Sequence, residues 1–151
     1  MGAGLYLHVP FCRRKCPYCN FYSVPAQPEL LTAYTAAVCR NLRHYGNAAQ
    51  PERVDTVYFG GGTPSLLLPA QIAQILETAA EQFALSADAE ITLEANPATV
   101  TPEQLRELRH AGINRLSLGV QSLSDAQLKR LGRLHTAQEA VKTVYAAAEA
   151  G

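Results

Sequence analysis

Three cysteines lie close together near the start of the chain, spaced as CxxxCxxC at Cys12, Cys16 and Cys19. Three thiolates on a 4Fe-4S cluster leave the fourth iron without a protein ligand, so that iron can chelate the amino and carboxylate groups of a small molecule. The three basic residues between Cys12 and Cys16 favour thiolates and offset the negative charge of such a cluster. A 4Fe-4S cluster with one iron open to a small molecule is therefore the first hypothesis for the loop.

A structural zinc site and a thiol redox pair also use closely spaced cysteines. Zinc prefers four ligands, usually in two pairs, and the remaining cysteine, Cys39, lies twenty residues after Cys19 on an expected helix. The CxxC formed by Cys16 and Cys19 resembles a thioredoxin-type motif, but such a motif usually opens a helix and has no use for Cys12. A cluster fits the spacing better, and Cys39 is most simply a buried thiol.

Other residue types further along the chain could bind a small molecule. The run Gly60-Gly61-Gly62-Thr63 lacks bulky side chains, so its backbone N–H and C=O groups can approach a ligand closely. A sharp strand-to-helix turn would also need these glycines, and the lysine of a phosphate-binding loop is missing. Glu94 ends an apolar segment, where an unpaired charge is costly, and it therefore needs a cationic partner.

These residues follow segments that alternate between two periodicities. Short β-rich segments predict strands at residues 5–9, 54–59, 91–94 and 116–120, with a long loop over 11–28. Apolar residues at three- and four-residue intervals predict helices at 29–46, around 72–83, after Thr101, at 124–131 and after Thr136. Thr101, Ser124 and Thr136 are the expected N-caps, Pro102 stands at a first helical position, and Gly112 ends its helix.

Strands alternating with helices predict right-handed crossovers and a parallel sheet with helices outside it, in a barrel or an open α/β sheet. The distinctive residues all follow a strand, at the edge where both folds place their sites. Gly151 resembles a helix C-cap, after which a fifth strand is expected. A (β/α) barrel typically needs about 250 residues, so residues 1–151 are expected to be the incomplete N-terminal part of one domain.

Composition excludes several functions. Lys plus Arg equals Asp plus Glu at 13 each, so no net charge favours nucleic acid or anionic lipid. A hydrophobic fraction of 48% is sufficient for a sizeable core. The sequence shows neither a basic leader before an apolar run nor a continuous apolar stretch of about 18 residues. We therefore expect a soluble, cytoplasmic protein that does not bind nucleic acid.

Five motifs resemble, in the same order, those of the oxygen-independent coproporphyrinogen III oxidase family, which belongs to the radical S-adenosylmethionine (SAM) superfamily. They are YLHVPFCRRKCPYCNF at 6–21, FGGGTPS at 59–65, LEANP at 93–97, LGVQS at 118–122 and LGRLH at 131–135. The resemblance spans nearly the whole chain. It implies about four βα units of a TIM-like radical SAM barrel, with a 4Fe-4S cluster on the three loop cysteines and SAM beside it.

The resemblance also assigns contacts with the adenosine and methionine parts of SAM. It places Tyr6 near the adenosine and packs Tyr18 against the adenine, although both could be ordinary strand and loop aromatics. An aromatic face stacks well on a base, and the cysteines on either side of Tyr18 fix it beside the cofactor. Gly61, Gly62 and Thr63 are expected to contact the methionine part.

Three polar residues complete the implied site. Glu94 would bind the ammonium of SAM, Arg133 its carboxylate and Gln121 a ribose hydroxyl. Without the resemblance, Arg133 would be interpreted as a solvated cation at a helix end. His8 and His135 are ambiguous, and neither is assigned as a ligand.

Two functions in the family differ in class. One is an oxidase that decarboxylates coproporphyrinogen III to protoporphyrinogen IX, and the other is a haem chaperone that delivers haem to respiratory proteins. The oxidases usually have a further cysteine where this chain has Phe21, and an N-terminal arm before the first strand. Both differences favour the chaperone branch. The resemblance further implies SAM cleavage, haem or a porphyrinogen as ligand, and an electron donor such as a flavodoxin or ferredoxin.

Overall fold

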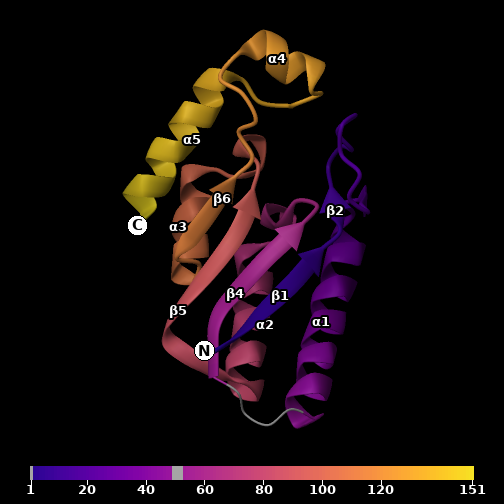
Figure 1. The fold of residues 1–151 in the computed structure, drawn as a ribbon, viewed down its shortest axis with the longest axis vertical. Coiled ribbons are helices and arrows are strands. Elements are labelled where there is room, and N and C mark those ends of the chain that lie inside the picture. The colour runs from indigo at the N-terminus through magenta and orange to yellow at the C-terminus, as the bar shows by residue number, and fades with distance from the viewer. Residues whose placement is uncertain (1, 49–52) are drawn as a thin grey trace.

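A parallel sheet forms the centre of the computed structural model, which describes residues 2–48 and 53–151. Within these residues the sheet has four strands in the order β1-β4-β5-β6, all parallel. The strands are β1 (Ala3–Val9), β4 (Arg53–Gly61), β5 (Ala84–Ala95) and β6 (Arg115–Leu118). Because they all run in one direction, their carboxyl ends meet at the same edge (Figure 1).

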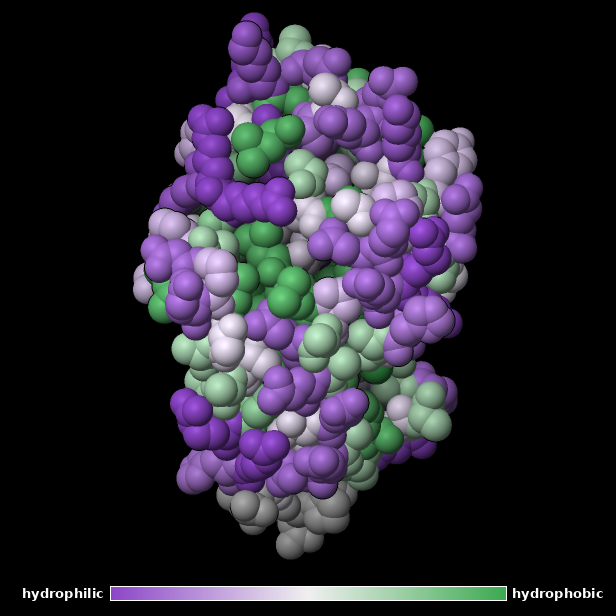
Figure 2. Space-filling view, turned by 180° about the vertical axis from the view of Figure 1, so that it is seen from behind, coloured by the Kyte–Doolittle hydropathy of each residue, from purple (hydrophilic) through white to green (hydrophobic). Residues whose placement is uncertain are grey.

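Helices follow the strands; most lie on one side of the sheet, and the short helix at residues 125–130 lies beyond its carboxyl edge (Figure 1). They are α1 (Pro28–Ala48), α2 (Pro69–Gln82), α3 (Pro102–His110), α4 (Asp125–Arg130) and α5 (Ala137–Ala150), with short 3-10 turns η1 (Pro64–Leu66) and η2 (Pro97–Thr99). Seen from behind, the surface is mostly hydrophilic, with hydrophobic residues in separate clusters (Figure 2). Within the described residues no helix is both long and apolar enough to cross a membrane.

Strand alternation separates an apolar face from a polar one. Side chains that point toward the helices are fully buried, among them Val9, Val57, Phe59 and Leu93, and they pack with Ile72 and Ile75 of α2. Because successive side chains of a strand point to opposite faces, the residues between them lie on the open face of the sheet. The core therefore fixes which side chains can reach a ligand at the carboxyl edge.

The expected α/β class, parallel sheet and helix order are confirmed. Thr101 and Thr136 cap their helices, each accepting a hydrogen bond from a backbone N–H three residues later at 3.2 Å. Ser124 occupies the N-cap position of α4, but its side chain makes no capping hydrogen bond. Cys39 is 1% exposed, as expected for a buried thiol.

Several element boundaries differ from the expected ones. β5 starts at Ala84, because Ala84 and Leu85 pair with Arg53 and Val54 although the following residues are polar. β4 continues through Gly60 and Gly61, which pair with β1. β6 ends at Leu118 rather than at residue 120. The long loop contains two short paired strands, β2 (Phe11–Cys12) and β3 (Val24–Pro25).

Candidate functional site

One cavity of about 330 Å³ at the carboxyl edge of the sheet brings together nearly all the expected site residues. Its lining includes Cys12, Cys16, Tyr18, Cys19, Gly61, Gly62, Thr63, Glu94, Gln121 and Arg133. These residues come from the cysteine loop, the ends of β4 and β5, and the segments after β6 and α4. Most of these residues meet because they end or follow a parallel strand, whereas Arg133 reaches the cavity from the segment after α4.

Tyr6 is the expected residue that does not line this cavity. It lies on the open face of β1 with 59% of its surface exposed. Its ring stacks on Tyr58 of β4, with centroids 6.0 Å apart, and its hydroxyl lies 3.1 Å from His8 Nδ1. Tyr6 therefore connects to the cavity through Tyr58, whose hydroxyl donates to the cavity residue Glu94.

The cysteine loop is closed at its base by backbone hydrogen bonds. Val24 N donates to Pro10 O at 2.8 Å, and Ala26 N donates to Cys12 O at 3.1 Å. Within the loop, Cys19 N donates to Cys16 O at 3.0 Å, which forms a turn rather than the start of a helix. A thioredoxin-type motif would open a helix, so this geometry disfavours the redox-pair interpretation.

The three loop thiols are free, half-buried and oriented toward one cavity. Within residues 2–48 and 53–151, no three His, Cys, Asp or Glu side chains converge closely enough to hold a single metal ion. In a 4Fe-4S cluster each thiolate binds a different iron, so three thiols can hold one cluster without converging on a single metal ion.

The glycine turn leaves no room for side chains. A Cβ on Gly61, where φ is +115°, would lie 2.6 Å from the His8 ring, and one on Gly62 would lie 2.7 Å from Phe11 O. The backbone amides of this turn, however, already have protein partners. Gly62 N donates to Val9 O at 2.8 Å and Thr63 N to Phe11 O at 2.7 Å. In this conformation the turn can offer carbonyl oxygens to a ligand, but not the N–H groups of Gly62 and Thr63.

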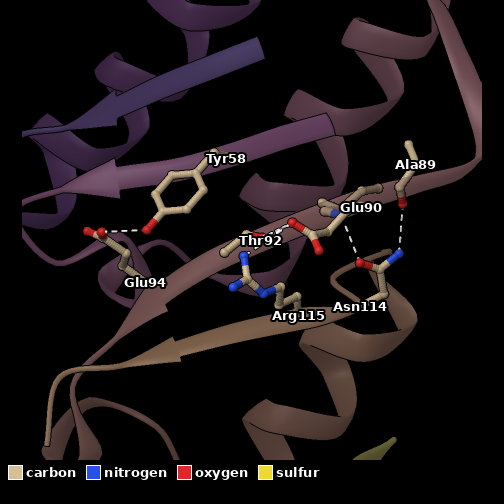
Figure 3. Close-up of polar contacts among 8 residues, drawn as sticks. Tyr58, Ala89, Glu90, Thr92, Glu94, Asn114 and Arg115 are labelled. Carbon is tan, nitrogen blue, oxygen red and sulfur yellow. Dashed lines mark hydrogen bonds and ion pairs between the residues drawn. The ribbon is translucent and has the colours of Figure 1, made fainter. Parts of the chain in front are cut away.

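Glu94 projects from the end of β5 onto the open face of the sheet. Its carboxylate accepts a hydrogen bond from the Tyr58 hydroxyl at 2.8 Å (Figure 3) and another from Gly61 N at 3.0 Å. The nearby cation on β6, Arg115, instead pairs with Glu90 at 3.2 Å. A carboxylate has about four lone-pair sites, so one that accepts two hydrogen bonds can still accept others from a cation.

Arg133, in the segment between α4 and α5, crosses the site. Its Nη2 donates to Asn96 Oδ1 and, at 2.7 Å, to Gly119 O, while its Nη1 lies 3.7 Å from Cys16 Sγ. Its Nε is buried without a partner among the described residues. The interpretation of Arg133 as a solvated cation at a helix end is therefore wrong.

A polar chain continues from Arg133 to the cysteine loop. Asn96 Nδ2 donates to Thr63 Oγ1 at 3.2 Å, and Thr63 Oγ1 lies 3.6 Å from Cys12 Sγ. Asn96 was not expected to have a role of its own, since Asn96-Pro97 indicates only the end of a strand. No local signal distinguishes an asparagine that ends a strand from one that also joins two distant segments.

Gln121 and His135 lie near the site in different ways. Gln121 is an exposed cavity residue with φ of +67°, a conformation that non-glycine residues adopt infrequently and that is often found at functional sites. His135 is 4% exposed, and its Nε2 lies 3.1 Å from Val120 O. Burial lowers the pKa of His135, so the ring favours the neutral form and has the surroundings of a structural histidine.

Known proteins are similar to this chain over nearly its whole length. The family model described as "Radical SAM superfamily" matches residues 6–151. The mitochondrial radical S-adenosyl methionine domain-containing protein 1 of Mus musculus is 44% identical over 143 residues, which cover 94% of this chain and 32% of that protein. The haem chaperone HemW of Escherichia coli (strain K12) is 43% identical over 149 residues, covering 98% of this chain and 39% of HemW.

A solved structure agrees closely with the whole described fold. The coproporphyrinogen III oxidase HemN from Escherichia coli superposes with a TM-score of 0.90 at 30% identity, covering 98% of this chain and 34% of that one. The expected TIM-like arrangement of βα units is confirmed by this similarity. The chain spans about a third of the length of these relatives.

Proposed function

We propose, from the premise that this chain belongs to the radical SAM superfamily, that Cys12, Cys16 and Cys19 bind a 4Fe-4S cluster and that SAM binds beside it. The observation that carries this proposal is that the three thiols, the glycine turn and Glu94 line the same cavity. When bound, the reduced cluster supplies the electron that splits the sulfonium of SAM. The protein's own task is to hold and shield the two groups.

The charged residues of the cavity are suited to the two charged groups of the methionine part. Glu94, whose carboxylate is oriented by two hydrogen bonds, binds the ammonium. Arg133, which lines the same cavity, binds the carboxylate, for which the planar fork of its guanidinium is suited. Gly61, Gly62 and Thr63 contact the methionine part of SAM between its ammonium and its carboxylate. They do so through carbonyl oxygens, because the amides of Gly62 and Thr63 already have protein partners.

The remaining cofactor contacts concern the nucleoside. Tyr18 stacks on the adenine, since its ring is 45% exposed and lies between two cysteines of the cavity. Gln121, which lines the cavity and has a left-handed backbone conformation, forms a hydrogen bond with a ribose hydroxyl. Tyr6, on the open face, lies near the adenosine.

We further propose that these residues are the N-terminal part of a longer radical SAM domain. Within the described residues, the outer edges of β1 and β6 have no strand partner. The chain also covers only 32% and 39% of two similar proteins. Because an unpaired parallel strand leaves backbone groups unsatisfied, further strands are expected to cover both edges. The experiments below use the longer protein that contains residues 1–151.

For that longer protein we propose a haem chaperone that passes haem to respiratory proteins, with a flavodoxin or ferredoxin as electron donor. Similarity to a protein named haem chaperone supports this, at 43% identity against 30% for the oxidase HemN. Phe21 supports it too, since it lines the cavity and is 63% exposed where oxidases usually have a cysteine. The alternative function is the oxidative decarboxylation of coproporphyrinogen III.

Removing either charged contact should weaken SAM binding. Glu94→Ala and Arg133→Ala each remove one half of a charge-paired clamp. A hydrogen bond to a charged group contributes about 1.5–3 kcal/mol, so affinity should fall about tenfold or more. Calorimetry with the reconstituted protein measures the change.

Glu90→Ala is the matched control for Glu94→Ala. Glu90 lies four residues earlier on the same strand and face, but it pairs with Arg115 instead of lining the cavity (Figure 3). Its removal should leave SAM affinity unchanged. Wild-type affinity in both Glu94→Ala and Arg133→Ala would remove these residues from the site.

An activity assay distinguishes the chaperone from the oxidase. The reconstituted protein should bind haem, yet form no protoporphyrinogen IX from coproporphyrinogen III in the presence of SAM and reductant. Haem binding alone is insufficient evidence, because a flat apolar macrocycle can occupy many pockets. Product formation at about one turnover per second, an ordinary enzyme rate, would overturn the chaperone proposal.

A further inference from the structure

We infer that Tyr58 is a positioning residue, whose hydroxyl holds the Glu94 carboxylate in the orientation that binds the ammonium of SAM. The inference rests on the proposed role of Glu94 and extends it to a neighbouring strand. Tyr58 is not among the residues expected to form the site. It reaches Glu94 because strand geometry places the two side chains diagonally on one face.

The register of the sheet explains this contact. Tyr58 of β4 pairs directly with Thr92 of β5, so Glu94 is its diagonal neighbour two residues further along the same face. Diagonal neighbours on a sheet are within reach of long and aromatic side chains. Figure 3 shows the Tyr58 hydroxyl directed along the strands toward the carboxylate. The oxygen–oxygen distance is 2.8 Å.

Tyr58 is itself held in place from the opposite side. Tyr6 of β1 is its register partner, and the two rings stack with an interplanar angle of 24°. Three adjacent strands therefore contribute to one assembly, in which Tyr6 restricts Tyr58 and Tyr58 restricts Glu94. The hydroxyl that orients the carboxylate is thus part of the rigid sheet and not of a loop.

The hydrogen bonds that the Glu94 carboxylate accepts leave it able to bind an ammonium. Tyr58 donates to Oε1 of Glu94, whereas Gly61 N donates to Oε2, so each carboxylate oxygen has one protein donor. Each oxygen has two lone-pair sites and keeps one for a ligand. Both donors belong to β4, whereas Glu94 belongs to β5. The Glu94 side chain is therefore held at its carboxylate as well as at its backbone. A carboxylate fixed in this way loses less conformational entropy when a cation binds.

Tyr58 can act as a donor throughout the neutral pH range. The hydrogen bond to Glu94 is the main cause that raises the pKa of Tyr58 above its ordinary value of 10.0. The hydroxyl is therefore protonated at neutral pH. Its proton has a fixed acceptor in the Glu94 carboxylate.

The test compares SAM with an analogue that lacks the α-amino group. Tyr58→Phe keeps the ring that stacks on Tyr6 and removes only the hydroxyl. We expect about three- to tenfold weaker binding of SAM, the size of a typical net hydrogen-bond contribution, and unchanged binding of the analogue. Calorimetry on the reconstituted longer protein provides both affinities, and a thermal melt verifies folding.

Tyr34→Phe is the matched control, because Tyr34 is also a half-buried tyrosine whose hydroxyl donates a hydrogen bond, to His8 O at 2.7 Å. It should change thermal stability without changing SAM affinity. A double-mutant cycle supplies the second readout. In a Glu94→Gln background, Tyr58→Phe should change SAM affinity by less than about twofold, because its target charge is gone.

The outcomes separate this inference from the function on which it rests. If Tyr58→Phe weakened the binding of SAM and of the analogue equally, Tyr58 would have only a structural role. Additive effects of Tyr58→Phe and Glu94→Gln on SAM affinity would lead to the same conclusion, and Glu94 would remain in the site. Wild-type SAM affinity in Tyr58→Phe would also overturn the inference alone. Wild-type SAM affinity in Glu94→Gln would overturn both the inference and the proposed role of Glu94.

Discussion

Serine in place of Cys12, Cys16 or Cys19 should abolish cluster binding. Anaerobic reconstitution of the wild-type protein with iron and sulfide should give about four irons per chain, and each variant should retain almost none. Thiolates are the ligands of such clusters, whereas a serine hydroxyl keeps its proton at neutral pH and replaces them poorly. Iron analysis, together with the visible absorption of the reconstituted protein, measures the loss.

Cys39→Ser is the internal control for these three variants. Cys39 belongs to α1, is 1% exposed and lies 3.9 Å from Gln74 O, away from the cavity. Its substitution should leave the iron content unchanged, since the buried hydroxyl keeps an acceptor. Loss of the cluster in a folded Cys39→Ser variant would show that the ligands have been assigned wrongly.

Gly62→Ala should disrupt both the fold and the site. The added Cβ would lie 2.7 Å from Phe11 O and 3.0 Å from both Phe11 N and Val9 O. These are backbone atoms of the segment that leads into Cys12, so they cannot move without displacing the cysteine loop. We expect a loss of about 3 kcal/mol in the free energy of unfolding, the upper range for overpacking, together with loss of iron binding. Urea unfolding and iron analysis measure the two effects.

Gly4→Ala provides the comparison. A Cβ at Gly4 would also approach another atom closely, at 2.8 Å, but that atom is Thr56 Oγ1, part of a side chain. Because a side chain can change rotamer, the cost should stay below about 1 kcal/mol. Equal destabilisation by the two alanines would contradict the argument that the backbone of the β1–β2 segment determines the effect at Gly62.

Sequence periodicity was sufficient for the order and type of the main elements. The apolar stripe over 29–46 and the caps at Thr101 and Thr136 correspond to α1, α3 and α5. These signals are local, because capping and amphipathic spacing act within a few residues. The start of β5 at Ala84 was missed, since its polar residues become a strand only by pairing with β4.

The candidate site was predictable to a similar extent. Residues that follow strands had to meet at one edge, which located the cysteines, the glycine turn and Glu94 together. Which side chains touch was not predictable, because such contacts depend on register and long-range packing. The link from Tyr58 to Glu94 and that from Arg133 to Asn96 are of this kind. The occupied amides of the glycine turn likewise follow from its contact with Val9 and Phe11.

The contact between Arg133 and Cys16 joins residues 117 positions apart, and this separation affects biosynthesis. Translation proceeds at about 5–20 residues per second, so Cys16 is synthesised roughly 6–23 s before Arg133. Throughout that interval the thiols lack Arg133, which approaches Cys16 in the folded chain, and in its first part they also lack Thr63, which approaches Cys12. Cluster insertion is therefore expected only after all these segments have been synthesised and have docked.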